Sequence, residues 1–229
     1  MTSHSRKYRR RLHALPAAIA LLLFGVLWLF SHTSSAQVLL SAKTIDSWNR
    51  DCRHCRIEPH YDVILGEIIR MESRMGRALL SLNVDTEAGR PELSWKWSLD
   101  DYPEDAAGTM MRVTVNLASA AQGQTYRVHY VWNPSERTTH REMIDENEYI
   151  WVVSGLQQSP QRWYSIKRDV RQDLGRLLEK LPEDVMIVSL ETGISEPDGR
   201  KVRSAGYIDQ ITMTYLPEPI SLEPVATSD

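Results

Sequence analysis

The sequence predicts an all-β domain: an antiparallel sandwich with one peripheral amphipathic helix. Apolar and polar residues alternate along a series of short segments, which is typical of strands with one buried face. Turn-forming sequences such as Asn133-Pro134-Ser135 and Glu196-Pro197-Asp198-Gly199 separate these segments. Many short strands joined by short turns favour an antiparallel sandwich over a parallel sheet.

The alternation also predicts which side chains form the core. The four clearest strands cover residues 78–84, 93–99, 111–117 and 126–132. Further strands are expected at residues 61–71, 148–154, 185–191 and 205–216. In the clearest strands one face is apolar and directed inward, and its aromatic members are Trp95, Trp97, Tyr130 and Trp132.

Residues 168–181 break the alternation, because their leucines fall at helical spacing before Pro182. We expect a peripheral helix there, with Asp169 as its N-terminal cap or first-turn acid. Arg168 is expected to clamp a neighbouring carboxylate in bidentate fashion, and it is also a candidate ligand-binding residue.

Residues 1–36 are expected to form an apolar export leader helix. Five cations and no acid precede an apolar run over residues 14–30, and Ser34-Ser35-Ala36 follows it. This pattern fits a signal peptide cleaved before Gln37. The alternative is an uncleaved signal anchor in the inner membrane. Both alternatives place residues 37–217, the β-sandwich domain, in the periplasm, followed by a disordered tail over residues 218–229.

The charge of the exported part argues against a nucleic-acid partner. The chain has 27 basic and 30 acidic residues, and five of the basic ones lie in the leader, which leaves 22 against 30 and a net charge of −8. An acidic domain without a basic stripe does not suit a polyanionic backbone. No glycine-rich phosphate loop is present either, so we expect no nucleotide partner.

The two cysteines, Cys52 and Cys55, are separated by two residues. In an oxidising compartment this spacing favours a local disulfide. A metal site that also uses His54 and His60 is the alternative. Covalent haem attachment is excluded because Arg56, and not histidine, follows Cys55.

Several segments together resemble a known bacterial exported family. They are Leu93-Ser94-Trp95-Lys96-Trp97, Met111-Arg112-Val113-Thr114-Val115, the run 128–132, the run 152–155, Trp163 with the run 167–170, and Tyr207-Ile208-Asp209-Gln210-Ile211. In this order they are similar to the family catalogued as domain of unknown function three-zero-four-seven, over about residues 44 to 217.

The resemblance implies a jelly-roll β-sandwich related to galactose-binding-like carbohydrate modules, and it implies no established activity. The chain departs from the family in two places. Residues 106–109 lack the acids that members tend to have before the Met-Arg-Val strand. Leu190-Glu191-Thr192-Gly193 lacks a doubled acid. An acid-dependent or metal-dependent role of the family is therefore not expected to carry over.

Candidate metal ligands follow from Asp209, which shares parity with Tyr207 and Ile211 and is therefore directed toward the apolar side. A buried carboxylate needs a partner. That partner could be a structural Ca²⁺ held with Glu191 or Asp46, or it could be an arginine. Alternatively, a bulge near Gly206 turns Asp209 to solvent.

Candidate ligand-binding residues come from aromatic and polar positions. Trp132 and Trp163, at a strand end and in a loop, are better placed than mid-strand tryptophans to stack on a sugar. A polar ladder is expected on an outer sheet face if the strands that carry it are neighbours; its members are Lys96, Arg112, Thr114, Asn116, Arg127 and His129.

The sequence contains no convincing catalytic motif, such as Gly-x-Ser-x-Gly. The leading hypothesis is therefore a non-catalytic exported module that binds a glycan or another component of the cell envelope. The alternatives are an enzyme acting on envelope polysaccharide and a structural partner in an envelope complex. The hypotheses differ in what they require: an exposed aromatic beside polar groups, two carboxylates across a cleft, or an apolar exposed patch.

Overall fold

A computed structural model describes residues 36–74, 76–84, 86, 89–102, 108–195 and 203–217. The expectations for the leader and for the tail at 218–229 fall outside this range. Among the described residues, no helix is both long and apolar enough to cross a bilayer.

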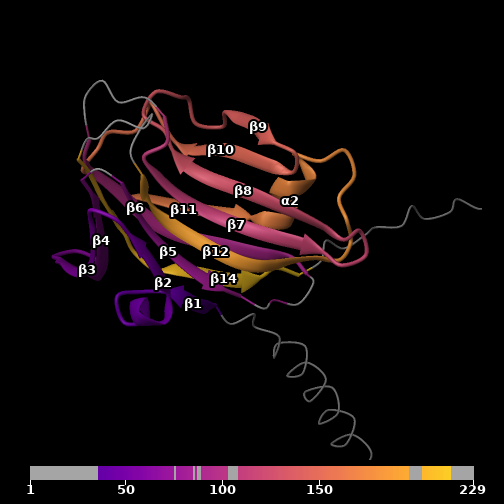
Figure 1. The fold of residues 1–229 in the computed structure, drawn as a ribbon, viewed down its shortest axis with the longest axis horizontal. Helices are drawn as coiled ribbons and strands as arrows, with labels where there is room; N and C mark the ends of the chain where they lie inside the picture. The colour runs from indigo at the N-terminus through magenta and orange to yellow at the C-terminus, as the bar shows by residue number, and fades with distance from the viewer. Residues whose placement is uncertain are drawn as a thin grey trace, which may run out of the picture. The chain divides into compact units, whose positions relative to one another are not determined.

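Two sheets pack face to face, which confirms the predicted β-sandwich (Figure 1). Over the described residues, sheet A runs in the order β1-β14-β6-β13-β4-β3, and β11 pairs with the opposite side of β6. Its strands are β1 (Gln37–Leu40), β3 (Cys55–Asp62), β4 (Gly66–Ser73), β6 (Pro91–Asp101), β11 (Tyr164–Asp169), β13 (Ser204–Ile208) and β14 (Ile211–Tyr215).

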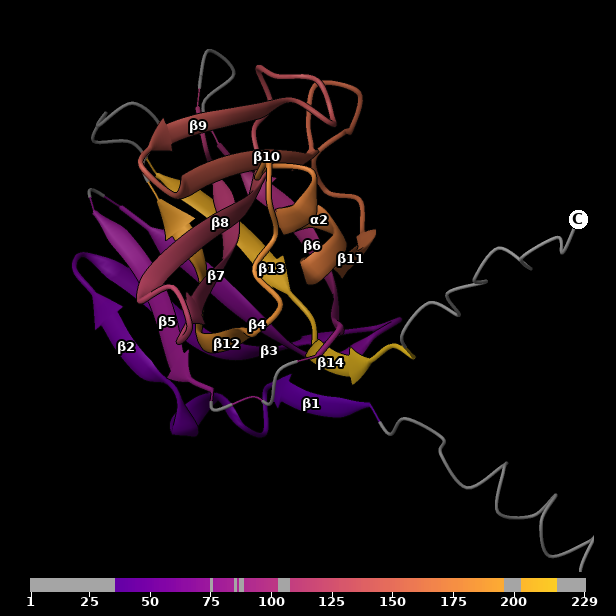
Figure 2. The same cartoon turned by 90° about the vertical axis from the view of Figure 1, so that its right-hand side faces the viewer.

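Sheet B runs in the order β2-β5-β12-β7-β8-β10-β9 and lies toward the viewer in Figure 1. Its strands are β2 (Asn49–Cys52), β5 (Arg77–Asn83), β7 (Met111–Ser119), β8 (Gln124–Trp132), β9 (Arg141–Asp145), β10 (Glu148–Ser154) and β12 (Val185–Ser195). A short 3-10 helix, η1 (Ile45–Ser47), precedes β2, and α2 (Val170–Gly175) follows β11 directly (Figure 2).

The core lies between the two sheets and is rich in aromatic rings. Trp95 and Trp97 of sheet A are in T-shaped contact, with ring centroids 5.6 Å apart. They reach across to sheet B, where Trp97 contacts Trp132 at 6.0 Å and Trp95 contacts Tyr130 at 5.8 Å. The Trp97 indole N–H donates to Ser154 Oγ at 2.9 Å. All four predicted core aromatics are buried, so the inward set was assigned correctly.

A buried ion pair links β11 to α2 at one end of this core. Asp169 caps α2 by accepting a hydrogen bond from the Gln172 N–H at 2.9 Å. Arg168 donates two hydrogen bonds to Asp173, at 2.7 and 2.6 Å, and its guanidinium lies over the Trp151 ring at 4.3 Å. Burial raises the pKa of Asp173. Arg168 is therefore the carboxylate clamp that the sequence suggested.

The structure differs from the expected strand pattern in three ways. First, β10 pairs with β8 in parallel, so sheet B is not wholly antiparallel. Second, the strand expected at residues 61–71 is a hairpin. Asp62 Oδ1 accepts from the N–H groups of Ile64 and Leu65 at 2.8 Å, and Gly66 takes a φ of +80°, so the chain turns there. Third, β1, β2, β9 and β11 were not expected.

The expected helix over residues 168–181 spans only Val170–Gly175. Leu177, Leu178 and Leu181 still pack against the core from an irregular segment. Their spacing therefore reflects which residues are buried, and it does not require a continuous helix.

Candidate functional site

The outer face of sheet A carries three aromatic rings that lie outside the core. They are His60 of β3, Tyr207 of β13 and Trp163, which directly precedes β11; we call them the aromatic platform. The Tyr207 ring centroid lies 5.3 Å from that of His60 and 6.3 Å from that of Trp163. His60 is exposed, and the other two are half-buried.

Strand order explains how residues so far apart in sequence meet. Strands β3, β4, β13 and β6 are consecutive neighbours in sheet A. His60 pairs in register with Ile68 of β4, and Tyr207 pairs with Arg70 two residues further on. Ile68 points away from the core by alternation with Ile69, yet it is only 2% exposed. We infer that the platform rings cover it.

Tyr207 reaches the outer face because Ile208, its neighbour, occupies the core with no exposed surface. The sequence expectation was the reverse, with Tyr207 and Asp209 inward. A register shift against β6 falls between Ala205 and Gly206, and Asp209 and Gln210 separate β13 from β14. The parity of the segment therefore changes within it. The change falls at Asp209 and Gln210 and not near Gly206, and Asp209 lies beside Lys96 with its side chain 15% exposed.

Carboxylates and a guanidinium surround the platform. Tyr207 Oη donates to Asp100 Oδ2 at 3.2 Å, and the Arg70 guanidinium lies 5.9 Å from the Tyr207 ring centroid. Burial raises the pKa of Tyr207, and Asp100 raises it further. The backbone N–H groups of Leu65 and Ile64 lower the pKa of Asp62, as do the Trp163 indole and His60. Asp62 is thus an ionised acceptor at the platform, Asp100 accepts from Tyr207, and Arg70 is a donor.

This arrangement suits a polyhydroxylated ring. Flat aromatic faces pack against the C–H surface of a sugar, while charged neighbours hydrogen-bond its hydroxyl groups. Trp163 was predicted as a binding candidate and lies in this site. His60 and Tyr207 were not among the candidate ligand-binding residues named from sequence, and the signal that could have found Tyr207 is Ile208, which competes with it for the core.

The outer face of sheet B carries most of the predicted polar ladder. Arg112, Thr114 and Asn116 of β7 lie beside Arg127 and His129 of β8. Lys96 does not belong to it, because β6 is part of sheet A.

The ladder residues are hydrogen-bonded to one another and to β10 and β12. His129 Nδ1 lies 2.7 Å from Thr114 Oγ1, and its Nε2 lies 2.7 Å from Glu148 Oε1. Arg127 donates to Asn116 Oδ1 at 2.8 Å and to Glu148 at 3.3 Å. Asn116 in turn donates to Ser189 and Glu191 of β12, at 2.8 and 3.2 Å. We call this the sheet B network.

Burial sets the protonation of the sheet B network. It lowers the pKa of His129, so the imidazole is neutral, accepts from the Thr114 hydroxyl and donates to Glu148. The bond from His129 lowers the pKa of Glu148. Burial also lowers the pKa of Arg112, whose Nε has no hydrogen-bond partner among the described residues.

A groove of about 380 Å³ opens beside this network. It is lined by Asn116, Leu117, Thr125, Tyr126, Arg127, Glu146, Asn147, Glu148, Val188, Ser189 and Glu191. The one aromatic ring in its wall, Tyr126, is 4% exposed, so it presents no face for stacking.

Two of the remaining candidate ligand-binding residues have structural positions. Trp132 is 1% exposed and contacts Tyr164 edge to face at 5.3 Å, so stacking on a ligand does not fit its burial. Arg168 is committed to Asp173, as described above. Of the candidates named from sequence, Trp163 lies on the aromatic platform, and Arg112 and His129 lie on the outer face of sheet B.

The candidate metal ligands are far from sharing one ion. Asp209 lies beside Lys96 of sheet A, with 4.0 Å between carboxylate and ammonium. Glu191 lies on the outer face of sheet B, and Asp46 pairs with Arg50 at 2.6 Å. In the part of the chain that the structure describes, no three His, Cys, Asp or Glu side chains are grouped to hold a metal. Asp209, Glu191 and Asp46 therefore do not form the shared Ca²⁺ site that the sequence suggested.

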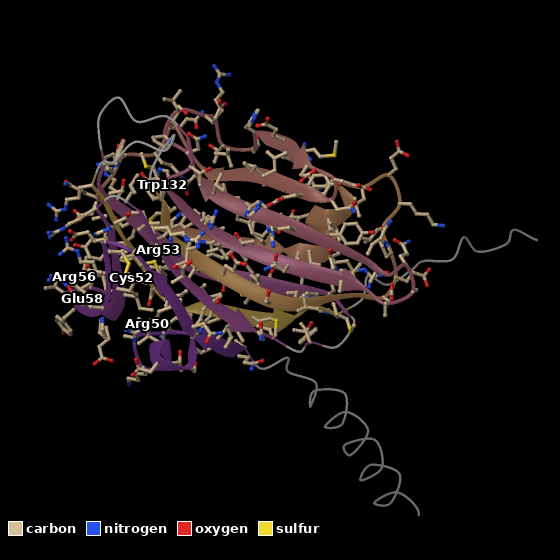
Figure 3. The ribbon with its side chains drawn as sticks, viewed as in Figure 1. Arg50, Cys52, Arg53, Arg56, Glu58 and Trp132 are labelled. Atoms are coloured by element: carbon tan, nitrogen blue, oxygen red, sulfur yellow. A yellow bond between two sulfur atoms is a disulfide. The ribbon has the colours of Figure 1, made fainter. Side chains whose placement is uncertain are left out.

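Cys52 and Cys55 form a disulfide with each other. It joins the end of β2, in sheet B, to the start of β3, in sheet A, across Arg53 and His54, the latter with a φ of +50°. The disulfide therefore closes the corner where the chain passes between the sheets (Figure 3).

No family model and no curated protein matches this chain. Solved structures with a similar arrangement include TmCBM61 in complex with beta-1,4-galactotriose, at 9% identity and a TM-score of 0.40, covering 79% of this chain and 99% of that one. A family 16 carbohydrate-binding module is 8% identical with a TM-score of 0.44, covering 77% and 99%. The CBM22-1 xylan-binding domain of Paenibacillus barcinonensis Xyn10C is 12% identical with a TM-score of 0.41, covering 82% and 99%. At these scores the likenesses carry no argument about ligand or activity.

Proposed function

We propose that the chain is an exported, non-catalytic β-sandwich module that binds a glycan of the cell envelope on its aromatic platform. One observation carries the proposal: the rings of His60, Tyr207 and Trp163 gather outside the core on one sheet face, beside carboxylates and an arginine. The export part rests on the basic, apolar leader in the sequence.

The platform is held in place before a ligand arrives. Tyr207 is fixed by its hydrogen bond to Asp100 and by the guanidinium of Arg70. Asp62 is fixed by the hairpin turn, where it accepts two backbone hydrogen bonds. Binding therefore orders few additional side chains, and a preordered surface loses less conformational entropy on association.

The test is a glycan array followed by calorimetric titration of the best ligand against wild type and Trp163→Ala. Loss of one stacking ring should weaken binding about tenfold or more, since such contacts contribute roughly 1 kcal/mol beyond the area they bury. Tyr61→Ala is the matched control. Tyr61 follows His60 on β3 and is 71% exposed, but among the described residues it makes no ring contact with the platform.

Equal binding by wild type and Trp163→Ala would remove the platform from the proposal, and absence of any glycan binding would overturn the proposal. Release of reducing ends from a bound glycan would replace a binding module with an enzyme. Near-ultraviolet circular dichroism of each variant checks that the fold is retained.

A structural role in an envelope complex is the second candidate, and one observation favours it. The turn between β3 and β4 exposes Val63 at 88% and Ile64 at 82%, and exposed apolar side chains at a rigid turn are typical of protein contacts. The variant Val63→Ser/Ile64→Ser separates the two candidates. It should leave glycan binding unchanged, whereas a module that acts by docking through this turn would lose its partner.

A further inference from the structure

Two rings of the aromatic platform lie at one level along β6, a strand with neighbours on both sides. Tyr207 of β13 is opposite Ser98 of β6. On the other side of β6, Trp163 directly precedes the pair formed by Tyr164 and Trp97, so it reaches the same level. Ser98 points outward by alternation with Trp97, yet it is only 4% exposed. The rings of Tyr207 and Trp163, with centroids 6.3 Å apart, account for this burial.

Three polar side chains lie one step further along β6, on the same outer face. Lys96 is two residues from Ser98, and Ser165 of β11 is opposite Lys96. On the other side, the backbone N–H of Asp209 donates to the Lys96 carbonyl at 2.9 Å. Two residues of a strand span about 7 Å, so these side chains lie about that far from the level of the rings. We call Lys96, Ser165 and Asp209 the polar row.

The polar row has hydrogen-bonding groups that the fold does not use. The Lys96 ammonium lies 4.0 Å from the Asp209 carboxylate, which is too far for a hydrogen bond. Among the described residues, neither of these two groups nor the Ser165 hydroxyl makes a hydrogen bond. The side chain of Lys96 is 44% exposed and that of Asp209 is 15% exposed, and Ser165 is exposed. A donor and an acceptor are thus open to a ligand side by side.

The next row along β6 differs, because its groups are already paired. The hydroxyl oxygens of Ser94 and Thr212 are hydrogen-bonded to each other at 2.6 Å. Lys167, opposite Ser94 in the register of β11, forms an ion pair with Glu92 at 2.8 Å. Of these two rows, the one with groups free for a ligand is therefore the one beside the platform.

A hydroxyl group of a ligand fits between the two charges of the polar row. An oxygen about 2.8 Å from each charged group can bridge the gap between them. It accepts a hydrogen bond from the Lys96 ammonium and donates its own proton to the Asp209 carboxylate. Hydrogen bonds of this kind, with one ionised partner, are stronger than those between neutral groups. The two charges offset each other, so the pair favours neither an anion nor a cation.

We propose that the polar row is a second sugar subsite, so that the module binds an uncharged, linear oligosaccharide that runs along β6. One sugar ring stacks on the platform, and the next sugar presents its hydroxyl groups to Lys96, Asp209 and Ser165. The inference rests on the proposed function and adds the substrate class to it, which is a chain of at least two sugars and not a single terminal sugar.

The experiment measures how affinity depends on the length of the oligosaccharide. The full chain is titrated with mono-, di- and trisaccharides of β-1,4-linked glucose, xylose, galactose and N-acetylglucosamine, and with the best ligand from the array. Calorimetry serves for the longer ligands and NMR titration for the monosaccharides. In a series that binds, the disaccharide should bind at least about tenfold tighter than the monosaccharide, the value expected when a hydrogen bond to a charged group is added.

The variant Lys96→Met separates the two subsites, because it removes the ammonium and keeps an unbranched side chain. It should weaken disaccharide binding about tenfold and leave monosaccharide binding within about twofold. Lys167→Met is the matched control, a lysine on the same face that is paired with Glu92, and it should leave disaccharide binding unchanged. Trp163→Ala should weaken binding of every ligand, since the ring belongs to the platform.

The outcomes separate this inference from the proposed function. If Lys96→Met has no effect, or weakens mono- and disaccharide binding equally, the second subsite is overturned and Trp163-dependent glycan binding stays in place. An equal loss of disaccharide binding in Lys167→Met also overturns it, because the effect would not depend on the row. A charged glycan as the best array ligand contradicts the uncharged class. Binding of no oligosaccharide, with no ligand on the array, overturns both.

Discussion

The polar side chains on the two outer faces of the sandwich differ in how far they hydrogen-bond to one another. On sheet B, a carboxylate, an imidazole, a guanidinium and three amide or hydroxyl groups hydrogen-bond to one another across four strands. On sheet A, three rings stay outside the core, and several guanidiniums share one carboxylate.

The difference indicates which face is built for the fold and which is free for a ligand. Polar groups that satisfy one another stabilise the sheet and gain little from a new partner. Ring faces that lie outside the core still have surface available for a ligand. The groove beside the sheet B network has a volume of about 380 Å³, yet the sheet A face offers the better chemistry for a sugar.

The largest expected effect is on glycan binding, when a double variant on the sheet A face is compared with a double variant on the sheet B face. His60→Ala/Trp163→Ala should weaken glycan binding on the order of 100-fold, because two rings are lost. Asn116→Ala/Arg127→Ala, on the sheet B face, should leave the dissociation constant within about twofold. Calorimetric titration measures both. A greater loss for the sheet B pair would move the site to the groove.

The free energy of unfolding should depend more on the sheet B face than on the sheet A face. His129→Ala leaves the Thr114 hydroxyl and one bond of Glu148 unmade in a buried setting, so the free energy of unfolding should fall by about 1–3 kcal/mol. His60→Ala, at an exposed position, should change it by less than about 0.5 kcal/mol. Urea denaturation followed by tryptophan fluorescence gives both values. Equal losses would mean that the platform is as structural as the network.

The disulfide tests how far the faces depend on the corner that joins them. Cys52→Ser/Cys55→Ser opens a very short loop, for which chain entropy predicts a loss of roughly 1–2 kcal/mol. Thiol labelling of the oxidised chain should find no reactive cysteine, and two reactive thiols would contradict the bridge.

The smallest effect is a dependence of stability on pH. Burial holds the pKa of His129 below its ordinary value of 6.5, so below that pH the unfolded chain binds more protons than the folded one. The contribution of His129 is present above about pH 6.5 and is lost as the pH falls through its folded pKa. The lowered pKa of Glu148 acts in the same direction below 4.5. Urea unfolding at pH 7.5 and 5.5 should show a decrease that is smaller in His129→Gln; an equal decrease would exclude His129 as its origin.

Much of the fold could be predicted because the residues of a strand alternate between buried and exposed positions, and the buried positions carry apolar side chains. Trp95 and Trp97 were assigned to the core for that reason. The features that were not predicted depend on partners that are distant in sequence. The parallel pairing of β10 with β8 requires a crossover connection, and the path of that connection cannot be predicted from a local sequence pattern. The hairpin at Asp62 was missed although an acid and Gly66 marked it.

The site was predictable only in part, for the same reason. Trp163 could be named because a loop tryptophan cannot be explained by strand packing. Tyr207 could not, since a change of parity around Asp209 put Ile208 in the core instead. The ion pairs of Glu72 with Arg70 and Arg203 join β4 to the residue that precedes β13, and no pattern in one segment reveals that these residues meet.

The parallel pairing of β8 and β10 has a consequence for how the sandwich assembles. The hairpin of β7 and β8 closes through a local turn, whereas β10 can dock only after the whole of residues 133–147 has looped back. Contacts that close long loops form late. We therefore expect β9 and β10 to join last during refolding and to exchange their amide hydrogens soonest in the native state, with β9, exposed along its full length, ahead of every other strand of sheet B.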